Sequence, residues 1–193
     1  MNKTVIVLAL AFLVAASARA SDLSYTNVSI GYRQGEIADQ DHSGAGIFGN
    51  FAVSDSLFVS ANYSTLESDD EFDIGFGPSS IDRTSFSLGL GFHTPVSDKA
   101  DFVTSVAYSD QEAEFSGVTS DGNGYVLSAG VRALPAGNVE LSAFVNYADI
   151  EDESDTAIAA SARYAVSPAV SFGLTFSSAD DADVVTLDGQ YAF

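Results

Sequence analysis

The chain has 193 residues, of which 27 are acidic and 7 are Lys or Arg, giving a net charge of −20, and it contains no cysteine. A surface this acidic repels nucleic acid, so nucleic acid is excluded as a partner. The lack of cysteine excludes disulfides and thiolate chemistry. Apolar residues make up 46% of the chain, which predicts a folded protein despite the acidity.

The N-terminal residues predict an export signal. Lys3 supplies a positive start, and residues 5–16 form an apolar run that is too short to cross a bilayer. Ala18, Arg19 and Ala20 form a small-x-small cleavage site. We therefore expect a signal peptide at residues 1–20 and a single domain at residues 21–193. A short N-terminal membrane anchor is the alternative.

Apolar and small or polar residues alternate strictly through the rest of the chain, which predicts β-strands. The clearest strand carries Phe86, Leu88, Leu90 and Phe92 on one face, with serines and glycines between them. Ten segments show the pattern, in chain order: 28–32, 47–53, 57–63, 86–92, 102–108, 125–131, 139–147, 158–164, 170–176 and 185–193. An eight-stranded count is the alternative if one hairpin is misread.

The connections between these segments alternate in length. Short turns at 54–56, 95–99, 134–138 and 167–169 alternate with longer loops at 34–43, 67–83, 110–123 and 149–155, and the last connection, 178–182, is brief but acidic. Short turns at one end and longer loops at the other are typical of outer-membrane barrels. Most acidic residues fall in the longer loops, including Asp69, Asp70, Glu71, Glu151, Asp152 and Glu153.

The apolar face of every segment lacks Asp, Glu, Lys and Arg, as a lipid-facing surface requires. Aromatic residues fall at both ends of the segments, which predicts two girdles at the bilayer interfaces. The last segment carries Leu187, Tyr191 and Phe193 on its apolar face. The fold predicted is an all-β, antiparallel up-and-down transmembrane β-barrel of ten strands. A soluble sandwich or lipocalin-like barrel, whose apolar face would point inward, is the alternative.

With this strand pattern and terminal aromatic residue, the chain from Ser24 to Phe193 resembles the small bacterial outer-membrane β-barrel proteins, a porin-like superfamily that includes opacity-type and OmpX-like barrels. The resemblance implies delivery to the barrel-assembly machinery, which in such families recognises the final strand. Leu187, Tyr191 and Phe193 match that terminal pattern. It also implies location in the outer membrane of a Gram-negative cell.

Ionisable residues on the inward register are few. Arg132 and Glu140 flank the 134–138 turn, and Arg163 follows on the next strand, diagonally near Glu140. We expect these three side chains to form a charge cluster in the lumen, either as a structural ion network or as a constriction. The rest of the inward register is mostly small, with these further lumen candidates: Arg33, Asn50, Asn62, Asp101, Asn146, Asp188 and Gln190.

Neither histidine completes a catalytic constellation, so we expect no enzyme activity. His42 is expected in a loop beside Asp41, and His93 on the inward register. No catalytic, cofactor-binding or dedicated metal-binding residue is predicted. Diffuse binding of Ca²⁺ or Mg²⁺ is expected at the acidic loops, where the ions would bridge to phosphates of lipopolysaccharide.

The sequence thus predicts an integral outer-membrane barrel with a structural or surface-interaction role through its acidic outer loops. Its expected partners are outer-membrane lipid, lipopolysaccharide and the barrel-assembly machinery, and we expect a monomer. The alternative function is a narrow diffusion channel that favours cations, because an acidic mouth attracts cations.

Overall fold

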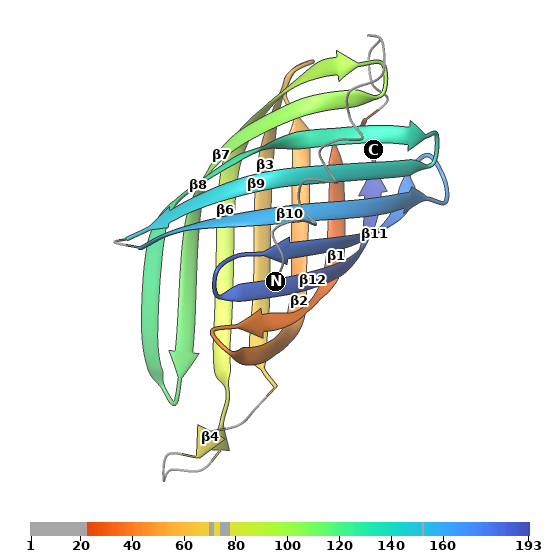
Figure 1. Cartoon of the computed structure of the whole chain (residues 1–193). Helices are drawn as coiled ribbons and strands as arrows, with labels where there is room; N and C mark the ends of the chain where they lie inside the picture. Colours follow the sequence, from red (N-terminus) through yellow and green to blue (C-terminus); the bar gives the residue numbers. More distant parts are fainter. Residues whose placement is uncertain (1–22, 70–71, 74–77, 152) are drawn as a thin grey trace.

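The computed structural model describes residues 23–69, 72–73, 78–151 and 153–193, and in these ranges it contains a closed barrel of ten antiparallel strands (Figure 1). The barrel strands are β1 (Asn27–Ile37), β2 (Gln40–Ala52), β3 (Leu57–Ser68), β6 (Ile81–Ser97), β7 (Ala100–Phe115), β8 (Val118–Ala136), β9 (Val139–Ile150), β10 (Glu153–Ala165), β11 (Val170–Ser178) and β12 (Ala182–Ala192). A separate two-stranded sheet pairs β4 (Phe72–Asp73) with β5 (Pro78–Ser79). The predicted signal peptide, residues 1–20, lies outside the described residues.

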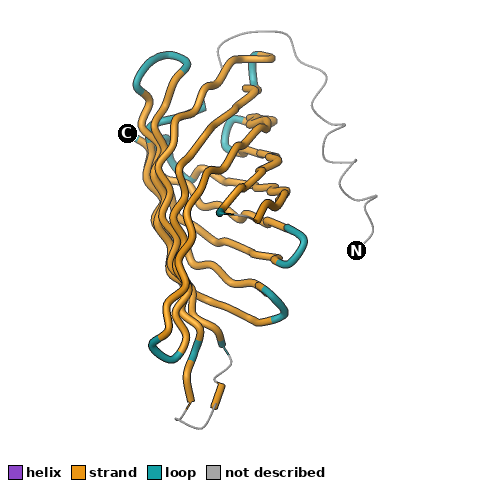
Figure 2. Tube along the Cα trace, turned by 90° about the vertical axis from the view of Figure 1, so that its left-hand side faces the viewer, coloured by secondary structure: helices purple, strands orange, loops and turns teal. Residues whose placement is uncertain are grey.

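Each barrel strand pairs with its neighbours along the chain, and β12 pairs with β1 to close the ring. The ten-strand prediction is therefore confirmed and the eight-strand alternative is wrong. Figure 2 shows that strands make up most of the described chain and that most of the connections between them are short. No helix in the described ranges is long and apolar enough to cross a membrane.

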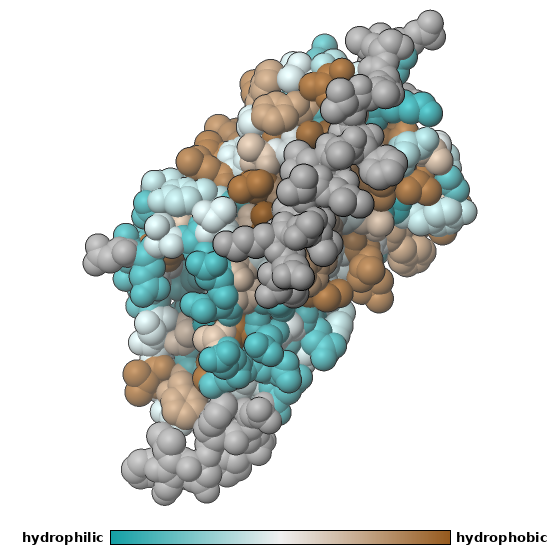
Figure 3. Space-filling model, viewed as in Figure 1, coloured by the Kyte–Doolittle hydropathy of each residue, from teal (hydrophilic) through white to brown (hydrophobic). Residues whose placement is uncertain are grey.

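The alternation along each strand separates an apolar outer face from a polar inner face. Leu88 and Leu127 are 50% and 45% exposed on the outside. Inside, Asn62 donates a hydrogen bond to Ser87 at 3.0 Å. Apolar residues on the outside are the reverse of a soluble barrel, so the soluble alternative is wrong. On the face drawn in Figure 3, hydrophobic residues are frequent in the upper part, and hydrophilic residues gather in the lower part and along the edges.

The aromatic residues of the two predicted girdles lie on the outer face at both ends of the strands. Tyr63 and Phe86, paired across β3 and β6, are 46% and 41% exposed near the loop end. Phe92 and Phe172 are 43% and 56% exposed near the turn end. The two predicted girdles are therefore present, and they mark the two edges of the lipid-facing band.

Three of the predicted long loops are instead extensions of the strands. β1 runs to Ile37 and β2 starts at Gln40, so only Ala38 and Asp39 turn the chain, with φ of 52° and 62°. Ser116 and Gly117 turn the β7–β8 hairpin in the same way, with φ of 50° and 78°. Two central residues with positive φ form the type I′ turn, which matches the twist of a hairpin. The loops were mispredicted because outward residues beyond the bilayer face water, so acids replace the apolar residues that mark a strand in the sequence.

Candidate functional site: the barrel interior and its acidic outer face

The first ion pair of the lumen lies at the turn end. Arg132 Nε donates to Glu140 Oε1 at 2.8 Å, and the two side chains are 13% and 19% exposed. Arg132 precedes the β8–β9 turn and Glu140 follows it, so the hairpin itself brings them together. In a narrow interior with little water, such a pair gives each charged group a partner of opposite charge.

Arg163 forms a separate pair, which corrects the predicted three-residue cluster. It lies opposite Glu140 in the β9–β10 register, but its Nη2 donates to Asp188 Oδ2 at 2.8 Å and to Oδ1 at 3.0 Å. Arg163 and Asp188 lie on β10 and β12, with Gly173 of β11 between them in register. Since Gly173 has no side chain, the guanidinium can cross β11 and reach a buried carboxylate instead of sharing Glu140.

The segment before β1 also enters the lumen at the turn end, and sequence reasoning missed it. Tyr25 is 5% exposed, its hydroxyl donates to Asp101 Oδ2 at 3.0 Å, and its ring stacks on His93 with centroids 3.7 Å apart. The guanidinium carbon of Arg132 lies 4.5 Å from the centroid of the same ring. A signal was available: residues 23 and 25 have the same parity as the inward residues of β1, so an apolar residue there points into the barrel.

In the described chain Phe48, Phe58 and Phe144 also face inward, although the inward register was predicted to be mostly small. Phe58 lies against Gly91, and Phe144 against Gly130, its partner on β8. Phe48 lies against Gly46 of its own strand. A Cβ at any of these glycines would collide with the ring, so each glycine provides the space for one aromatic side chain.

His42 lies inside the barrel at the loop end, and its predicted loop position is wrong. Its side chain is 0% exposed, Nδ1 is 2.9 Å from the Gln40 carbonyl oxygen, and Arg83 Nε donates to Nε2 at 3.3 Å. The residue is part of β2, and the two-residue turn at Ala38 and Asp39 places it on the inward face.

The acidic residues of the extended strands lie on the outer face in register. Glu67 of β3 pairs with Asp82 of β6, which pairs with Glu114 of β7. In the next outward row toward the lipid-facing band, Glu112 of β7 pairs with Asp121 of β8. We call Glu67, Asp82, Glu112, Glu114 and Asp121 the acidic ladder. In the described part of the chain no member of the ladder forms an ion pair.

The predicted acidic loop residues surround this ladder. Asp69 Oδ1 accepts a hydrogen bond from Ser43 Oγ at 2.8 Å. Glu151 lies in the β9–β10 turn with φ of 55°, and Glu153 begins β10. Asp70, Glu71 and Asp152 lie outside the described residues.

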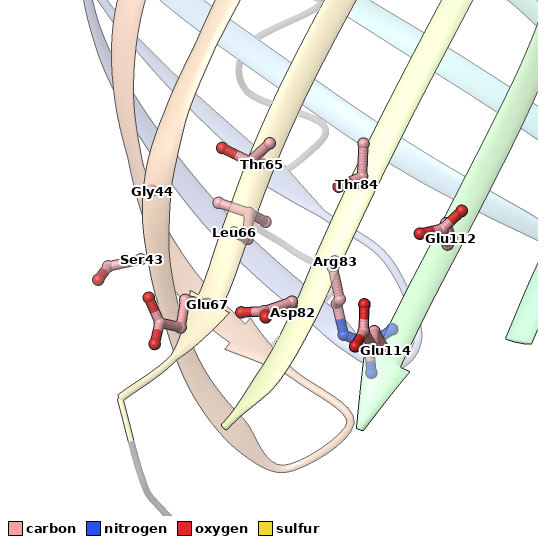
Figure 4. A pocket seen from close by; sticks show the side chains of 10 residues that line it. All are labelled: Ser43, Gly44, Thr65, Leu66, Glu67, Asp82, Arg83, Thr84, Glu112 and Glu114. Atoms are coloured by element: carbon pink, nitrogen blue, oxygen red, sulfur yellow. The ribbon is translucent and has the colours of Figure 1, made fainter. Parts of the chain in front are cut away.

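A hollow of about 380 Å³ lies at the ladder. Figure 4 shows Glu67, Asp82 and Glu114 along one row of the three strands, with Thr65, Thr84 and Glu112 in the next row. Among the described residues, no group of three or more His, Asp or Glu side chains is arranged to hold a metal ion. A cation at the ladder would therefore need oxygen ligands from a second molecule.

Residues 5–165 match the model of the outer membrane protein beta-barrel domain family. The chain belongs to this family. A comparison with curated protein sequences gives no match. The family and its structural neighbours imply location in the outer membrane of Gram-negative bacteria.

The outer membrane protease OmpT and the NanC porin share this fold. The outer membrane protease OmpT from Escherichia coli is 10% identical, with 93% of this chain and 100% of that chain covered and a TM-score of 0.57. The NanC porin is 9% identical, with 85% and 98% covered and a TM-score of 0.52. Ail of Yersinia pestis, solved with the heparin analogue sucrose octasulfate, is 14% identical, with 86% and 96% covered and a TM-score of 0.47.

Membership of the family does not decide between activities, because its structural neighbours include a protease and a porin. In the described chain the contacts of His42 are the Gln40 carbonyl and Arg83, and those of His93 are Asp101 and two aromatic rings. The expectation that the protein is not an enzyme stays a prediction.

The residues of the predicted assembly signal lie on the lipid-facing side of the closing strand. Leu187, Tyr191 and Phe193 are 61%, 52% and 68% exposed, and the rings of Tyr191 and Phe193 stack with centroids 6.0 Å apart. Their recognition by the barrel-assembly machinery stays a prediction.

Proposed function

We propose that this outer-membrane barrel acts at the cell surface, where its acidic ladder binds lipopolysaccharide through Ca²⁺ or Mg²⁺. The observation that carries the proposal is the row of Glu67, Asp82 and Glu114, three carboxylates directly opposite one another on neighbouring strands. Like charges directly opposite in a sheet are destabilising. A divalent cation relieves this repulsion.

The position of the ladder suits lipopolysaccharide. Glu67 follows Tyr63, a member of the outer girdle, by four residues, which is about 13 Å along a strand. Its side chain has the same outward parity as Tyr63 and is exposed. The ladder therefore faces sideways, just beyond the lipid-facing band, toward the head groups of neighbouring lipids. Phosphate oxygens of lipopolysaccharide would supply the ligands that the ladder lacks.

The test compares stability in two membranes. The barrel is placed in phosphatidylcholine vesicles with or without lipopolysaccharide, and its unfolding temperature is followed by heat-modifiable gel mobility, with Ca²⁺ or with EDTA. Binding to the folded state raises the unfolding temperature. We expect an increase that requires both lipopolysaccharide and Ca²⁺, and that is largely lost in Asp82→Asn/Glu114→Gln.

The matched control is Asp180→Asn/Asp181→Asn. These two acids are exposed between β11 and β12, so the variant loses the same charge at the same end of the barrel, away from the ladder. It should keep the increase. An equal loss in both double variants would show that overall charge, and not the ladder, is responsible, and would reject the proposal.

A narrow, cation-favouring channel is the second candidate function, supported by the polar lining of the barrel. Hydrogen bonds join inward side chains around the interior, for example Ser64 with Ser85 and Ser128 with Asn146, at 2.8 and 2.7 Å. Single-channel conductance in KCl, with the reversal potential under a salt gradient, tests this candidate. Cation-selective steps, even rare ones, whose size changes in Arg132→Ala would support it.

A further inference from the structure

We propose that residues 23–26 form a stopper that closes the interior of the barrel at the turn end, and that displacing this segment opens a path for small ions. The inference builds on the second candidate function and is independent of binding to lipopolysaccharide. It starts from the burial of Leu23 and Tyr25, which are 8% and 5% exposed although neither residue belongs to a strand.

The stopper and the wall residues around it reach across the lumen. Leu23 and Tyr25 form a hydrophobic cluster with Phe58 and Val103, against which Ala52, Leu134 and Phe144 also pack. Ala52 belongs to β2 and Phe144 to β9. These strands are five neighbours apart in a closed ring of ten, and therefore lie on opposite walls. Apolar side chains that span the lumen exclude water from it.

Polar contacts hold the stopper to one wall. The Tyr25 hydroxyl donates to Asp101 of β7, and its ring stacks on His93 of β6. Arg132 of β8 lies over the ring and donates from Nη2 to the Ser24 carbonyl at 3.1 Å. Asp101 is 1% exposed, so the Tyr25 hydroxyl satisfies a carboxylate that water does not reach.

The contacts also divide the segment into an anchor and a removable part. Thr26 joins the barrel, because its carbonyl accepts from Phe193 N at 3.2 Å and its Oγ1 accepts from Ala52 N at 3.1 Å. The contacts of Leu23 and Tyr25 described above are made by their side chains. The segment can therefore swing out about Thr26 while the hydrogen bonds between the barrel strands stay intact.

Behind the stopper, two large rings belong to the wall of the barrel. The rings of Phe58 and Phe144 lie against glycines of the neighbouring strands, so they are part of the wall. Between them and the loop end the lining is mostly polar, as in the Ser142–Ser161 pair at 2.7 Å, with Phe48 as one inward ring and His42 at the far end. Tyr25 comes from outside the strands, and its removal deletes an obstacle without opening a hole in the wall.

The test measures conductance across a planar bilayer in KCl. The full chain, purified from the outer membrane of a Gram-negative host, is compared with Leu23→Ala/Tyr25→Ala, and heat-modifiable gel mobility shows that both are folded. We expect rare or no openings in the parent and steady current, at least about tenfold larger on average, in the double variant. Equal current in the two folded proteins, whether both conduct or both are silent, would overturn the proposal.

Two variants separate the stopper from a general effect of losing an aromatic ring. Tyr25→Phe keeps the ring that stacks on His93 and lies under Arg132, so it should stay closed like the parent. Tyr164→Ala removes a tyrosine that is 54% exposed on the outer face near the same end, and should also stay closed. Steady current in Tyr164→Ala equal to that of the double variant would overturn the assignment to the lumen.

A labelling experiment tests the insertion of the segment even if the double variant does not fold. The chain has no cysteine, so Leu23→Cys introduces a unique thiol. A water-soluble maleimide should label it at least about tenfold more slowly in the folded barrel than in the urea-unfolded chain, because the position is buried. Equal rates in the two states would show that the segment lies outside the lumen and would reject the stopper.

Discussion

Gly173 lies between Arg163 and Asp188 in register and leaves the space in which their side chains meet. A Cβ at this position would lie 2.7 Å from both Arg163 Nη2 and Asp188 Oδ1. The charges of Arg163 and Glu140 could be identified from the sequence, and so could their place on facing strands. The partner of Arg163 could not, because contact across two strands depends on the glycine between them, whereas sequence reasoning considers nearest neighbours.

Gly173→Ala is expected to destabilise the barrel by about 1–3 kcal/mol, because the new methyl group pushes apart a pair whose carboxylate is 4% exposed. Urea unfolding of the vesicle-embedded barrel measures the loss. Gly49→Ala is the control, since a Cβ there would approach no atom closer than 3.5 Å. An equal loss in both variants would mean that alanine in a strand, and not the ion pair, causes the effect.

Along the strands of this barrel, side chains point alternately inward and outward, both in the membrane and in the part beyond the girdle. Along β6, outward Leu88 and Phe86 face lipid, while outward Asp82 lies beyond the girdle in the acidic ladder. The apolar part of the pattern predicted the strand, its direction and its lipid-facing side. The part of each strand beyond the lipid-facing band was predicted as loop, because polar inward residues and acidic outward residues differ little in hydrophobicity. The two-residue type I′ turns mark where the β1–β2 and β7–β8 hairpins end.

Leu88→Arg is expected to impair insertion, because Arg in the lipid-facing band costs about 2–4 kcal/mol. Ser87→Arg, one residue earlier, should be better tolerated, since Ser87 faces the polar interior and contacts Asn62. The folded fraction in vesicles, measured by gel mobility without heating, compares the two variants. Equal tolerance would contradict the assignment of inner and outer faces.

At the scale of the whole molecule, charge and hydrophobicity are separated in space. The membrane-spanning wall is apolar outside, the interior contains isolated charge pairs, and the acids gather at one end of the strands. This separation could be predicted from the sequence because it follows from the period of the strands and the ends at which the connections lie. The inward position of Tyr25 was missed, because the residue lies outside the strands, although it has the same parity as the inward residues of β1.

Closure of the barrel also depends on β12, which pairs with β1 on one side and β11 on the other. The final strand is thus the element whose capture completes the ring. If its outward residues are what the assembly machinery recognises, Tyr191→Ala/Phe193→Ala should lower the amount of folded barrel in the outer membrane of living cells. The same variant should refold in vesicles nearly as well as the parent, because both side chains are more than half exposed and face lipid.

The control for this prediction is Tyr164→Ala/Phe172→Ala, which removes two outward aromatic residues that are 54% and 56% exposed near the same end of the barrel. Both double variants lose similar contact with lipid, so they should refold to a similar extent in vesicles. A smaller amount of folded barrel in cells for Tyr191→Ala/Phe193→Ala alone would place the assembly signal on the final strand. An equal reduction in cells for both variants would assign the defect to lost girdle contacts with lipid, because both pairs lose those contacts.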